Sequence, residues 1–176
     1  MKVLIIGGVA AGTKAAAKLK RMNPAADVTI LTKGKDISYA GCGLPYYVGG
    51  LIPEKEQLIV NTPAKFTELT GAKVLVEREV TSLDASAKQL AAKNLRTGME
   101  ETYSYDECVI ACGASSIVPP LQGVSLPGVF TMRTPDDAIE LRDYVECTGA
   151  KRAVVAGGGF IGLEAAENLA AKGLSV

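Results

Sequence analysis

The sequence predicts an α/β protein with a doubly wound parallel sheet, an inserted antiparallel β-meander and the start of a second βα unit. Three observations support this fold class. Residues 3–6 form a short apolar run that ends in a glycine turn, which is typical of a strand buried on both faces of a parallel sheet. Residues 73–95 change to a β-rich pattern. The opening pattern then returns at Ala153.

The first strand is expected to lead into a helix, a second strand and a short second helix. The apolar residues within Ala15–Leu19, together with Met22, form the apolar face of this helix, Lys18 lies on its polar face, and Asn23-Pro24 ends it. Residues 28–31 repeat the strand pattern and complete a βαβ unit with a right-handed crossover. Further on, Leu44–Val48 should form a short helix that ends at two glycines.

The middle of the chain is predicted to leave the doubly wound sheet and then return to it. Residues 73–95 should form the antiparallel meander, and Cys108–Ala111 a buried strand that ends at Gly113. A helix should begin after Thr134, a favourable N-cap, with Pro135 in its first turn followed by two aspartates.

The last part of the chain repeats the first strand and helix, with an apolar run at 153–156 and a helical pattern at 163–171. Because the second strand of this Rossmann-like unit would begin near Val176, we expect the chain to be the amino-terminal part of a longer protein. The predicted domains are an incomplete first domain at 1–117, a crossing segment and helix at 118–150, and the start of a second domain at 151–176.

Composition excludes several function classes. The chain has 19 basic and 19 acidic side chains, so no nucleic acid partner is implied. No uncharged stretch approaches the roughly 20 apolar residues of a membrane-spanning helix, and two early glycines argue against a signal peptide. The lack of histidine excludes Ser-His-Asp catalysis and histidine-ligated metal sites, and no metal site is expected. Four cysteines without paired spacing indicate reduced thiols in a cytoplasm.

Two glycine-rich turns, each between a strand and a helix, are candidate binding sites. Without a Cβ in the way, backbone N–H groups can approach a pyrophosphate at the positive end of the helix. The glycines are Gly7, Gly8 and Gly12 in the first turn and Gly157, Gly159 and Gly162 in the second. Two such turns predict two dinucleotides, and the alternative is that the glycines serve packing alone.

The first turn departs from the usual dinucleotide pattern at two positions. Val9 occupies the place of the middle glycine, and Thr32 stands where a ribose-binding acid is expected, about 20 residues beyond the last glycine. The Thr32 hydroxyl can form one hydrogen bond but brings no charge, and Asp36 is a nearby substitute. The corresponding residue of the second turn would follow Val176, so the sequence does not distinguish NADH from NADPH.

Cys42 is the candidate redox residue. It lies directly before the short helix at 44–48, and N–H groups at a helix start favour the thiolate, which attacks disulfides and peroxides. The alternative is a small buried cysteine with a packing role. Cys108 and Cys147 are interpreted as structural residues.

Four segments taken together resemble the pyridine nucleotide-disulfide oxidoreductases, in the family's order along the chain. They are Ile5–Gly12, Ser38–Pro45, Tyr105-Asp106 with Ala111–Ala114, and Gly157–Glu164. The chain is most similar to the single-cysteine branch, which contains coenzyme A-disulfide reductases, NADH oxidases and NADH peroxidases. Tyr47 stands where dithiol reductases have a second cysteine. Ala10 stands where oxidases and peroxidases have a histidine, which favours the coenzyme A-disulfide reductases.

The resemblance implies FAD in the domain at 1–117 and NADH or NADPH in the domain that begins at 151. Hydride from NAD(P)H would reach the flavin, which would pass electrons to an oxidised Cys42. The implied cofactor-binding residues are Gly7, Gly8, Ala11, Gly12, Thr32, Lys33, Val80, Ala111, Cys112, Gly113, Gly157, Gly159, Phe160, Ile161, Gly162 and Glu164. Cys112 replaces the usual threonine and is interpreted as a packing variant.

The resemblance also implies a substrate site. Lys18, Arg21 and Ser38 match positions that contact coenzyme A in such reductases, and the two cations can pair with its phosphates. The alternative is a solvated basic helix face. Two replacements count against coenzyme A: Gly41 stands in place of an asparagine beside the cysteine, and Thr70 in place of a lysine that often holds the ligand.

Three functions remain open. The first is FAD-dependent reduction of a low-molecular-weight disulfide such as coenzyme A disulfide. The second is an oxidase or peroxidase that uses a Cys42 sulfenic acid. The third is a nucleotide-binding module without turnover, because the resemblance places the rest of the nicotinamide domain downstream. It also places there the domain through which the full-length protein would form a homodimer.

Overall fold

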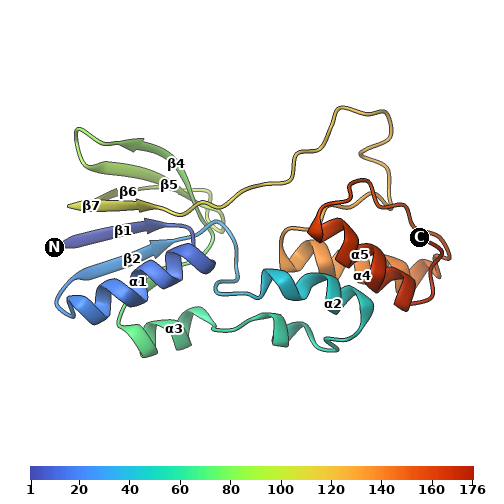
Figure 1. Cartoon of the computed structure of the whole chain (residues 1–176). Helices are drawn as coiled ribbons and strands as arrows, with labels where there is room; N and C mark the ends of the chain where they lie inside the picture. The colour runs from blue at the N-terminus through green and yellow to red at the C-terminus, as the bar shows by residue number, and fades with distance from the viewer. The chain divides into compact units, whose positions relative to one another are not determined.

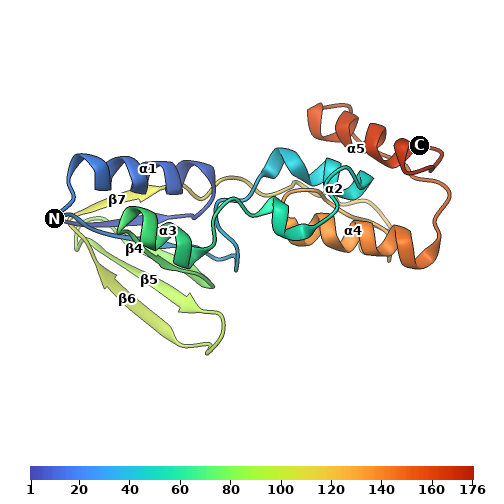
Figure 2. The ribbon, with the colours of Figure 1, turned by 90° about the horizontal axis from the view of Figure 1, so that it is seen from below.

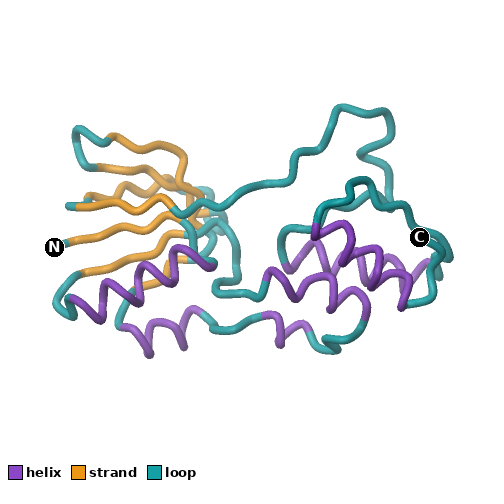
Figure 3. Tube along the Cα trace, viewed as in Figure 1, coloured by secondary structure: helices purple, strands orange, loops and turns teal.

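A computed structural model describes residues 1–176, and the chain divides into two compact units. Unit 1 consists of Met1–Tyr39 and Ile59–Gly113, and unit 2 of Ala40–Leu58 and Ala114–Val176. All seven strands belong to unit 1, whereas unit 2 is built from helices and loops (Figure 3).

Unit 1 contains a four-stranded parallel sheet with the strand order β3-β2-β1-β7 (Figure 1). Its strands are β1 (Lys2–Ile6), β2 (Asp27–Leu31), β3 (Lys73–Leu75) and β7 (Glu107–Ile110). Strand β1 pairs in parallel with β2, and helix α1 (Ala10–Met22) connects them. The predicted βαβ unit is therefore confirmed.

An antiparallel meander follows β3 in the chain, as predicted. It consists of β4 (Arg78–Asp84), β5 (Gln89–Asn94) and β6 (Glu100–Ser104). The prediction was wrong for the start of this segment, because Lys73–Leu75 pairs in parallel with β2 and belongs to the larger sheet. Val74 packs against one core of unit 1 and Leu75 against the other, and such two-sided packing is typical of a parallel strand.

The parallel sheet is the middle layer of unit 1. Helices α1 and α3 (Pro63–Thr70) cover one face, and the meander covers the other (Figure 2). Successive residues of β1 point to opposite faces, so Val3 and Ile5 pack on the helix side while Leu4 packs on the meander side. The apolar run at 3–6 thus reflects burial on both faces.

Two burial predictions for unit 1 were wrong. Strand β7 is an outer strand with one neighbour, and its Ile110 is 69% exposed rather than buried. Met22, expected on the apolar face of α1, is 72% exposed because the helix ends there. Lys20 instead covers the following turn, where its Nζ donates hydrogen bonds to the carbonyls of Pro24 and Ala26.

Unit 2 is a small helical cluster. Its elements are the 3₁₀ helix η1 (Gly41–Gly43), α2 (Leu44–Gly49), the 3₁₀ helix η2 (Lys55–Leu58), α4 (Pro135–Thr148) and α5 (Phe160–Ala171). The core contains Leu44 and Val48 of α2 with Ala138 of α4 and Leu169 of α5. The predicted start of α4 is confirmed, since Thr134 and Asp137 form a reciprocal capping box. None of the helices is long and apolar enough to cross a membrane.

The strand predicted at 153–156 does not form. One isolated parallel bridge joins Arg152 to Ser175, with hydrogen bonds from Ala153 N to Ser175 O (2.9 Å) and from Ser175 N to Lys151 O (2.9 Å). The apolar pattern requires a longer neighbouring strand for a ladder, and Ser175 contributes only one bridging residue.

Candidate nucleotide and thiol sites

The first glycine turn joins β1 to α1 and is tightly packed. Gly7 has a φ of +110°, and a Cβ built on Gly12 would lie 1.9 Å from the Gly7 carbonyl oxygen. A Cβ on Gly8 would lie 2.9 Å from a methyl carbon of Ile37. The close approach of helix, strand and loop therefore requires glycine at these three positions, whether or not a ligand binds.

The start of α1 nevertheless provides free donors. The first paired amide is that of Thr13, whose N–H donates to the Val9 carbonyl at 3.2 Å. The amides of Ala10, Ala11 and Gly12 have no acceptor within the chain, as expected for the first turn of a helix. No acidic side chain lies in this turn. Unpaired amides at a positive helix end fit the pyrophosphate of a dinucleotide.

Unit 1 brings several predicted cofactor residues to one edge of its parallel sheet. Gly7, Thr32 and Ala111 directly follow the carboxyl ends of β1, β2 and β7, respectively. Gly7 N donates to Leu31 O (2.8 Å), and Ala111 N donates to Ile6 O (2.8 Å). Ligands of open α/β sheets bind outside this edge, so the arrangement fits a dinucleotide there.

The other predicted residues of unit 1 differ in exposure. Lys33 is exposed and pairs with Glu79 at 2.8 Å, Val80 is half-buried, and Cys112 is exposed. Gly113 has a φ of +71°, which favours glycine. The ion pair means that the Lys33 cation already has a protein partner.

The three predicted substrate residues also lie in unit 1. Lys18 and Arg21 are exposed on α1. Ser38 has a φ of +51°, and its N–H donates to the Gly8 carbonyl at 2.9 Å, so it lies beside the first turn. Asn61, which the sequence analysis missed, donates from Nδ2 to Ser38 Oγ at 3.5 Å. No local motif identifies Asn61.

The second glycine turn joins the segment at 153–156 to α5. Gly157 has a φ of +125°, and a Cβ on Gly162 would lie 2.0 Å from the Gly157 carbonyl oxygen. By contrast, Cβ atoms on Gly158 and Gly159 would meet nothing within 4 Å. Within residues 1–176, no residue packs against these two glycines.

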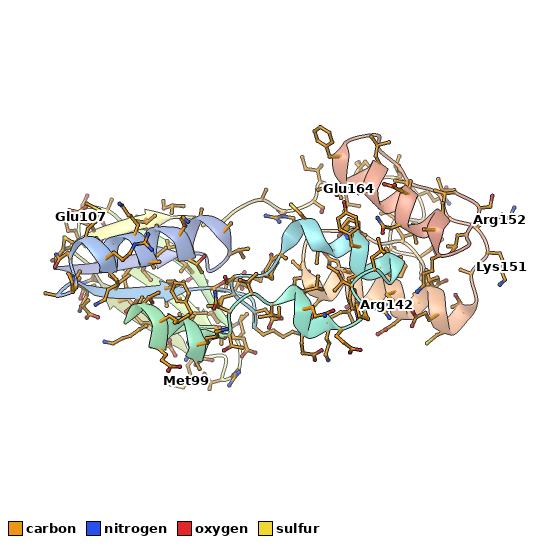
Figure 4. The ribbon with its side chains drawn as sticks, turned by 60° about the horizontal axis from the view of Figure 1, so that its bottom comes forward. Met99, Glu107, Arg142, Lys151, Arg152 and Glu164 are labelled. Atoms are coloured by element: carbon orange, nitrogen blue, oxygen red, sulfur yellow. The ribbon has the colours of Figure 1, made fainter.

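The start of α5 repeats the donor arrangement of α1. Leu163 N donates to Gly159 O at 2.9 Å, and the three preceding helix amides have no acceptor within the chain. A concavity of about 370 Å³ lies here, lined by Gly157, Gly158 and Gly162 and by side chains such as Val155 and Leu163. Of the other predicted residues, Phe160 and Ile161 are exposed, and Glu164 is half-buried on α5 (Figure 4).

Cys42 lies in unit 2, within η1 and directly before α2. Its side chain is exposed and the thiol is free, so the alternative of a small buried cysteine is wrong. The helical turn is closed by a hydrogen bond from Gly43 N to Ala40 O at 2.8 Å. Tyr47, five residues later, is buried in the core of unit 2 and supplies no second sulfur.

The remaining cysteines differ from one another. Cys108 is half-buried, and burial raises the pKa of its thiol, as expected for a structural cysteine. Cys112 and Cys147 are both exposed. The interpretations of Cys112 as a packing variant and of Cys147 as a structural residue stay predictions.

Arg142 on α4 is a further residue that the sequence analysis missed (Figure 4). Its guanidinium donates to the carbonyl oxygens of Tyr47, Ile52 and Pro53 and to the carboxylate of Glu146. The three carbonyls lie 89 to 95 positions away in the chain, so no local pattern predicts these contacts.

Comparison with known proteins agrees with this geometry. Residues 1–176 match the family described as pyridine nucleotide-disulphide oxidoreductase. An NAD(P)H coenzyme A polysulfide/persulfide reductase of Pyrococcus horikoshii is 40% identical over 176 residues, which are 99% of this chain and 38% of that protein. An NADH oxidase of Methanocaldococcus jannaschii is 34% identical over 176 residues, covering 100% of this chain and 39% of that protein.

A solved structure supports the same assignment. The NAD-dependent persulfide reductase of A. fulgidus is 40% identical, with a TM-score of 0.94 over 99% of this chain and 33% of that chain. The protein thus spans less than two fifths of the curated relatives named above. FAD binding is typical of the matching family, and the helix starts described above fit such a cofactor. The chain belongs to the pyridine nucleotide-disulphide oxidoreductase family.

Proposed function

We propose that the protein is an FAD-dependent oxidoreductase in which electrons from NAD(P)H reach the single thiol of Cys42 and reduce a low-molecular-weight disulfide. The observation that carries the proposal is an exposed, free Cys42 with buried Tyr47 at the position of a second cysteine. Such a thiol has no second cysteine in its own turn, and in this proposal its disulfide partner is a sulfur of the substrate.

The first step follows from thiol chemistry. The Cys42 thiolate attacks one sulfur of the substrate disulfide, the substrate S–S bond breaks, and one substrate thiolate leaves. Cys42 is then joined to the other half by a mixed disulfide. Two electrons and a proton return it to the thiolate and release the second substrate thiol. When bound, FAD supplies the transfer of these electrons from NAD(P)H.

The chain's own residues have three roles in this proposal. The free amides at the start of α1, around Ala11 and Gly12, hold the pyrophosphate of FAD. Thr32, at the carboxyl end of β2, contributes an uncharged hydroxyl near the ribose. The start of α5, with Gly159 and Gly162, holds NAD(P)H. The domain division at 117 and 151 is part of the same proposal.

Coenzyme A disulfide is the proposed substrate, and the relative from Pyrococcus horikoshii is named for coenzyme A polysulfide and persulfide. The exposed cations of Lys18 and Arg21 are available to phosphates. Thr70 offers no such cation, and its uncharged hydroxyl donates to Phe66 O (2.7 Å) at the end of α3. Phosphate contacts would therefore depend on α1.

A second candidate is an oxidase or peroxidase that cycles Cys42 through a sulfenic acid. The relative from Methanocaldococcus jannaschii, named NADH oxidase, favours it. Ala10 in the first glycine turn argues for the disulfide, since the sulfenic acid branch was expected to carry histidine there. A full-length homodimer and a cytoplasmic location, which free thiols suit, complete the proposal.

The test uses the full-length protein and two serine variants. Purified protein should show flavin absorbance and consume NAD(P)H faster with coenzyme A disulfide than with hydrogen peroxide or oxygen. Cys42→Ser should reduce disulfide-dependent consumption to background, while Cys147→Ser, the control at another exposed cysteine, should not. Full activity in Cys42→Ser would refute both thiol functions, whereas absence of NAD(P)H consumption with every acceptor would favour the nucleotide-binding module. A preference for peroxide would favour the second candidate.

A further inference from the structure

Arg142 of α4 reaches the end of the helical segment that carries Cys42. Its Nη1 donates to Tyr47 O at 3.3 Å, Ile52 O at 3.4 Å and Pro53 O at 3.0 Å. The side chain is 20% exposed, so most of it is removed from water. All these groups belong to unit 2, as does Cys42.

The contacted carbonyls lie at the end of helix α2 and in the turn that follows it. Helix α2 ends at Gly50, which adopts a left-handed conformation with a φ of +89° and donates its N–H to Tyr47 O at 3.1 Å. The chain then turns through Ile52 and Pro53. A guanidinium is suited to such a cluster because it has several donors in a fixed plane and carries a positive charge at the negative end of the helix.

Arg142 also stacks on an aromatic ring. Its Cζ lies 4.6 Å from the centre of the Tyr47 ring, and Tyr47 is 7% exposed. A cation over a buried aromatic face is attracted by the ring quadrupole. Tyr47 is therefore held both through its backbone carbonyl and through its side chain.

A carboxylate fixes the orientation of the guanidinium. Glu146, one turn further along α4, accepts from Arg142 Nε at 3.1 Å and from Lys172 Nζ at 2.7 Å. Both hydrogen bonds lower the pKa of the Glu146 carboxyl, and the one from Lys172 contributes more. The network thus ties α2 to α4 and to the end of α5.

We infer that Arg142 is a positioning residue for Cys42: it holds the continuous helical segment Gly41–Gly49 from its carbonyl end and so fixes where the thiol stands at the other end. The inference rests on the proposed function for the reactive role of Cys42. Arg142 contacts backbone carbonyls, the Tyr47 ring and Glu146, and it acts on the reaction through the segment that they belong to.

The test compares three variants of the full-length flavoprotein. Arg142→Gln removes the cation and the planar donor group, and Arg142→Lys keeps the cation without the planar group. Asp143→Asn is the control, because it changes the charge of the exposed neighbour on the same helix. Each variant is compared per bound flavin, so that loss of folded protein does not count as loss of rate.

Two half-reactions separate positioning from a general structural effect. Bleaching of the flavin by NAD(P)H does not involve Cys42 and should be unchanged in all variants. Turnover with the disulfide should fall about 10- to 100-fold in Arg142→Gln, the range expected when a reacting group is displaced by about 1 Å, with a smaller fall in Arg142→Lys. An equal fall in both half-reactions would overturn the inference.

Hydrogen exchange provides a readout that needs no turnover. Amides of Gly41–Gly49 should exchange faster in Arg142→Gln than in Asp143→Asn, whereas amides of α1 should not differ. Exchange and disulfide turnover equal to the control would overturn the inference. If Arg142→Gln does not fold, Arg142→Lys decides by the same measurements. Full activity of Cys42→Ser would refute the proposed function. The exchange result would still show whether Arg142 stabilises the segment Gly41–Gly49.

Discussion

The two glycine turns have the same backbone frame but differ in what their middle glycines contact. In both, the first glycine has a positive φ, and a Cβ on the last would lie about 2 Å from the carbonyl oxygen of the first. In the first turn Gly8 is packed against Ile37 and Thr32. In the second turn Gly158 and Gly159 face open space.

A glycine-rich motif can require glycine for two reasons, packing within the protein and close approach of a ligand. Gly12 and Gly162 are required because a Cβ at either position would meet the carbonyl oxygen of the first glycine of its turn, so the protein's own packing explains them. Gly158 and Gly159 meet no atom of residues 1–176, whereas Gly8 is contacted by Thr32 and Ile37, which follow the second strand of its own βαβ unit. Packing within residues 1–176 therefore accounts for Gly8, Gly12 and Gly162.

The largest expected effect is on the free energy of unfolding, when the last glycine of either turn is replaced by alanine. Alanine normally gains about 1 kcal/mol over glycine inside a helix, but here the new Cβ would meet a backbone oxygen. We expect Gly12→Ala to lower the free energy of unfolding by about 3 kcal/mol, since Gly12 is buried in unit 1. Gly162→Ala should cost less, because α5 starts in an exposed region and can shift.

Chemical denaturation of the full-length variants, followed by far-UV circular dichroism, measures this difference. Flavin content should fall with Gly12→Ala and stay near wild type with Gly162→Ala. Equal losses of stability would mean that the two turns are equally constrained by packing, and the comparison would fail.

A smaller effect on stability is expected from Gly159→Val, which gives the second turn the residue that the first turn has at Val9. Gly159→Val adds a side chain in open space, so the free energy of unfolding should change by less than about 0.5 kcal/mol. The side chain would occupy the approach to the free amides of α5, and the dissociation constant for NAD(P)H should rise about tenfold, which corresponds to about 1.4 kcal/mol. Isothermal titration of the full-length protein measures it.

The reciprocal change, Val9→Gly, is the matched control. Because Gly8 and Gly12 remain packed, it should leave flavin content unchanged. If Gly159→Val binds NAD(P)H normally, the open space beside Gly159 has no role in nucleotide binding.

The smallest expected effect is on the pH dependence of stability. Each unit contains one hydrogen-bonded carboxylate, and the two should contribute to different degrees. In unit 1, Glu101 accepts hydrogen bonds from Tyr103, Asn94 and Arg78, which lower its pKa from 4.5 to about 2. A depressed carboxyl pKa stabilises the folded state above pH 4.5, and this contribution is lost as the pH falls toward 2. Glu146 of unit 2 is 47% exposed, so solvent screens its contribution.

Acid titration of thermal stability tests this contrast. Glu101→Gln should flatten the dependence of the melting temperature on pH below 4.5 more than Glu146→Gln does. An equal or larger flattening by Glu146→Gln would show that the exposed network carries more of the acid sensitivity.

Local patterns predicted the elements that depend on nearby residues. The βαβ unit, the short helix after Cys42 and the capped start of α4 all follow from periodicity, glycine and N-cap chemistry within a few positions. The errors concern pairing across the chain. Lys73–Leu75 joins β2, β7 remains an outer strand, and the apolar run at 153–156 finds a single bridge.

The residues of the candidate site also fall into those that nearby sequence predicts and those that depend on the fold. Glycine turns and Cys42 are local signals, and the structure gives each of them a geometry that suits the proposal. Arg142 and Asn61 carry no such signal, because their partners are brought to them by the fold. The exposure of Cys112 and Cys147 was also outside what sequence spacing could predict.

The order of segments along the chain has a consequence for biosynthesis. Residues 40–58 pack with 114–176 although unit 1 residues separate them in sequence. On the ribosome, the apolar side chains of Leu44 and Val48 therefore emerge well before the helices that shield them. Stalled nascent chains should be cleaved by protease between 40 and 58 until α5 has left the exit tunnel, and early resistance would show that this stretch folds unaided.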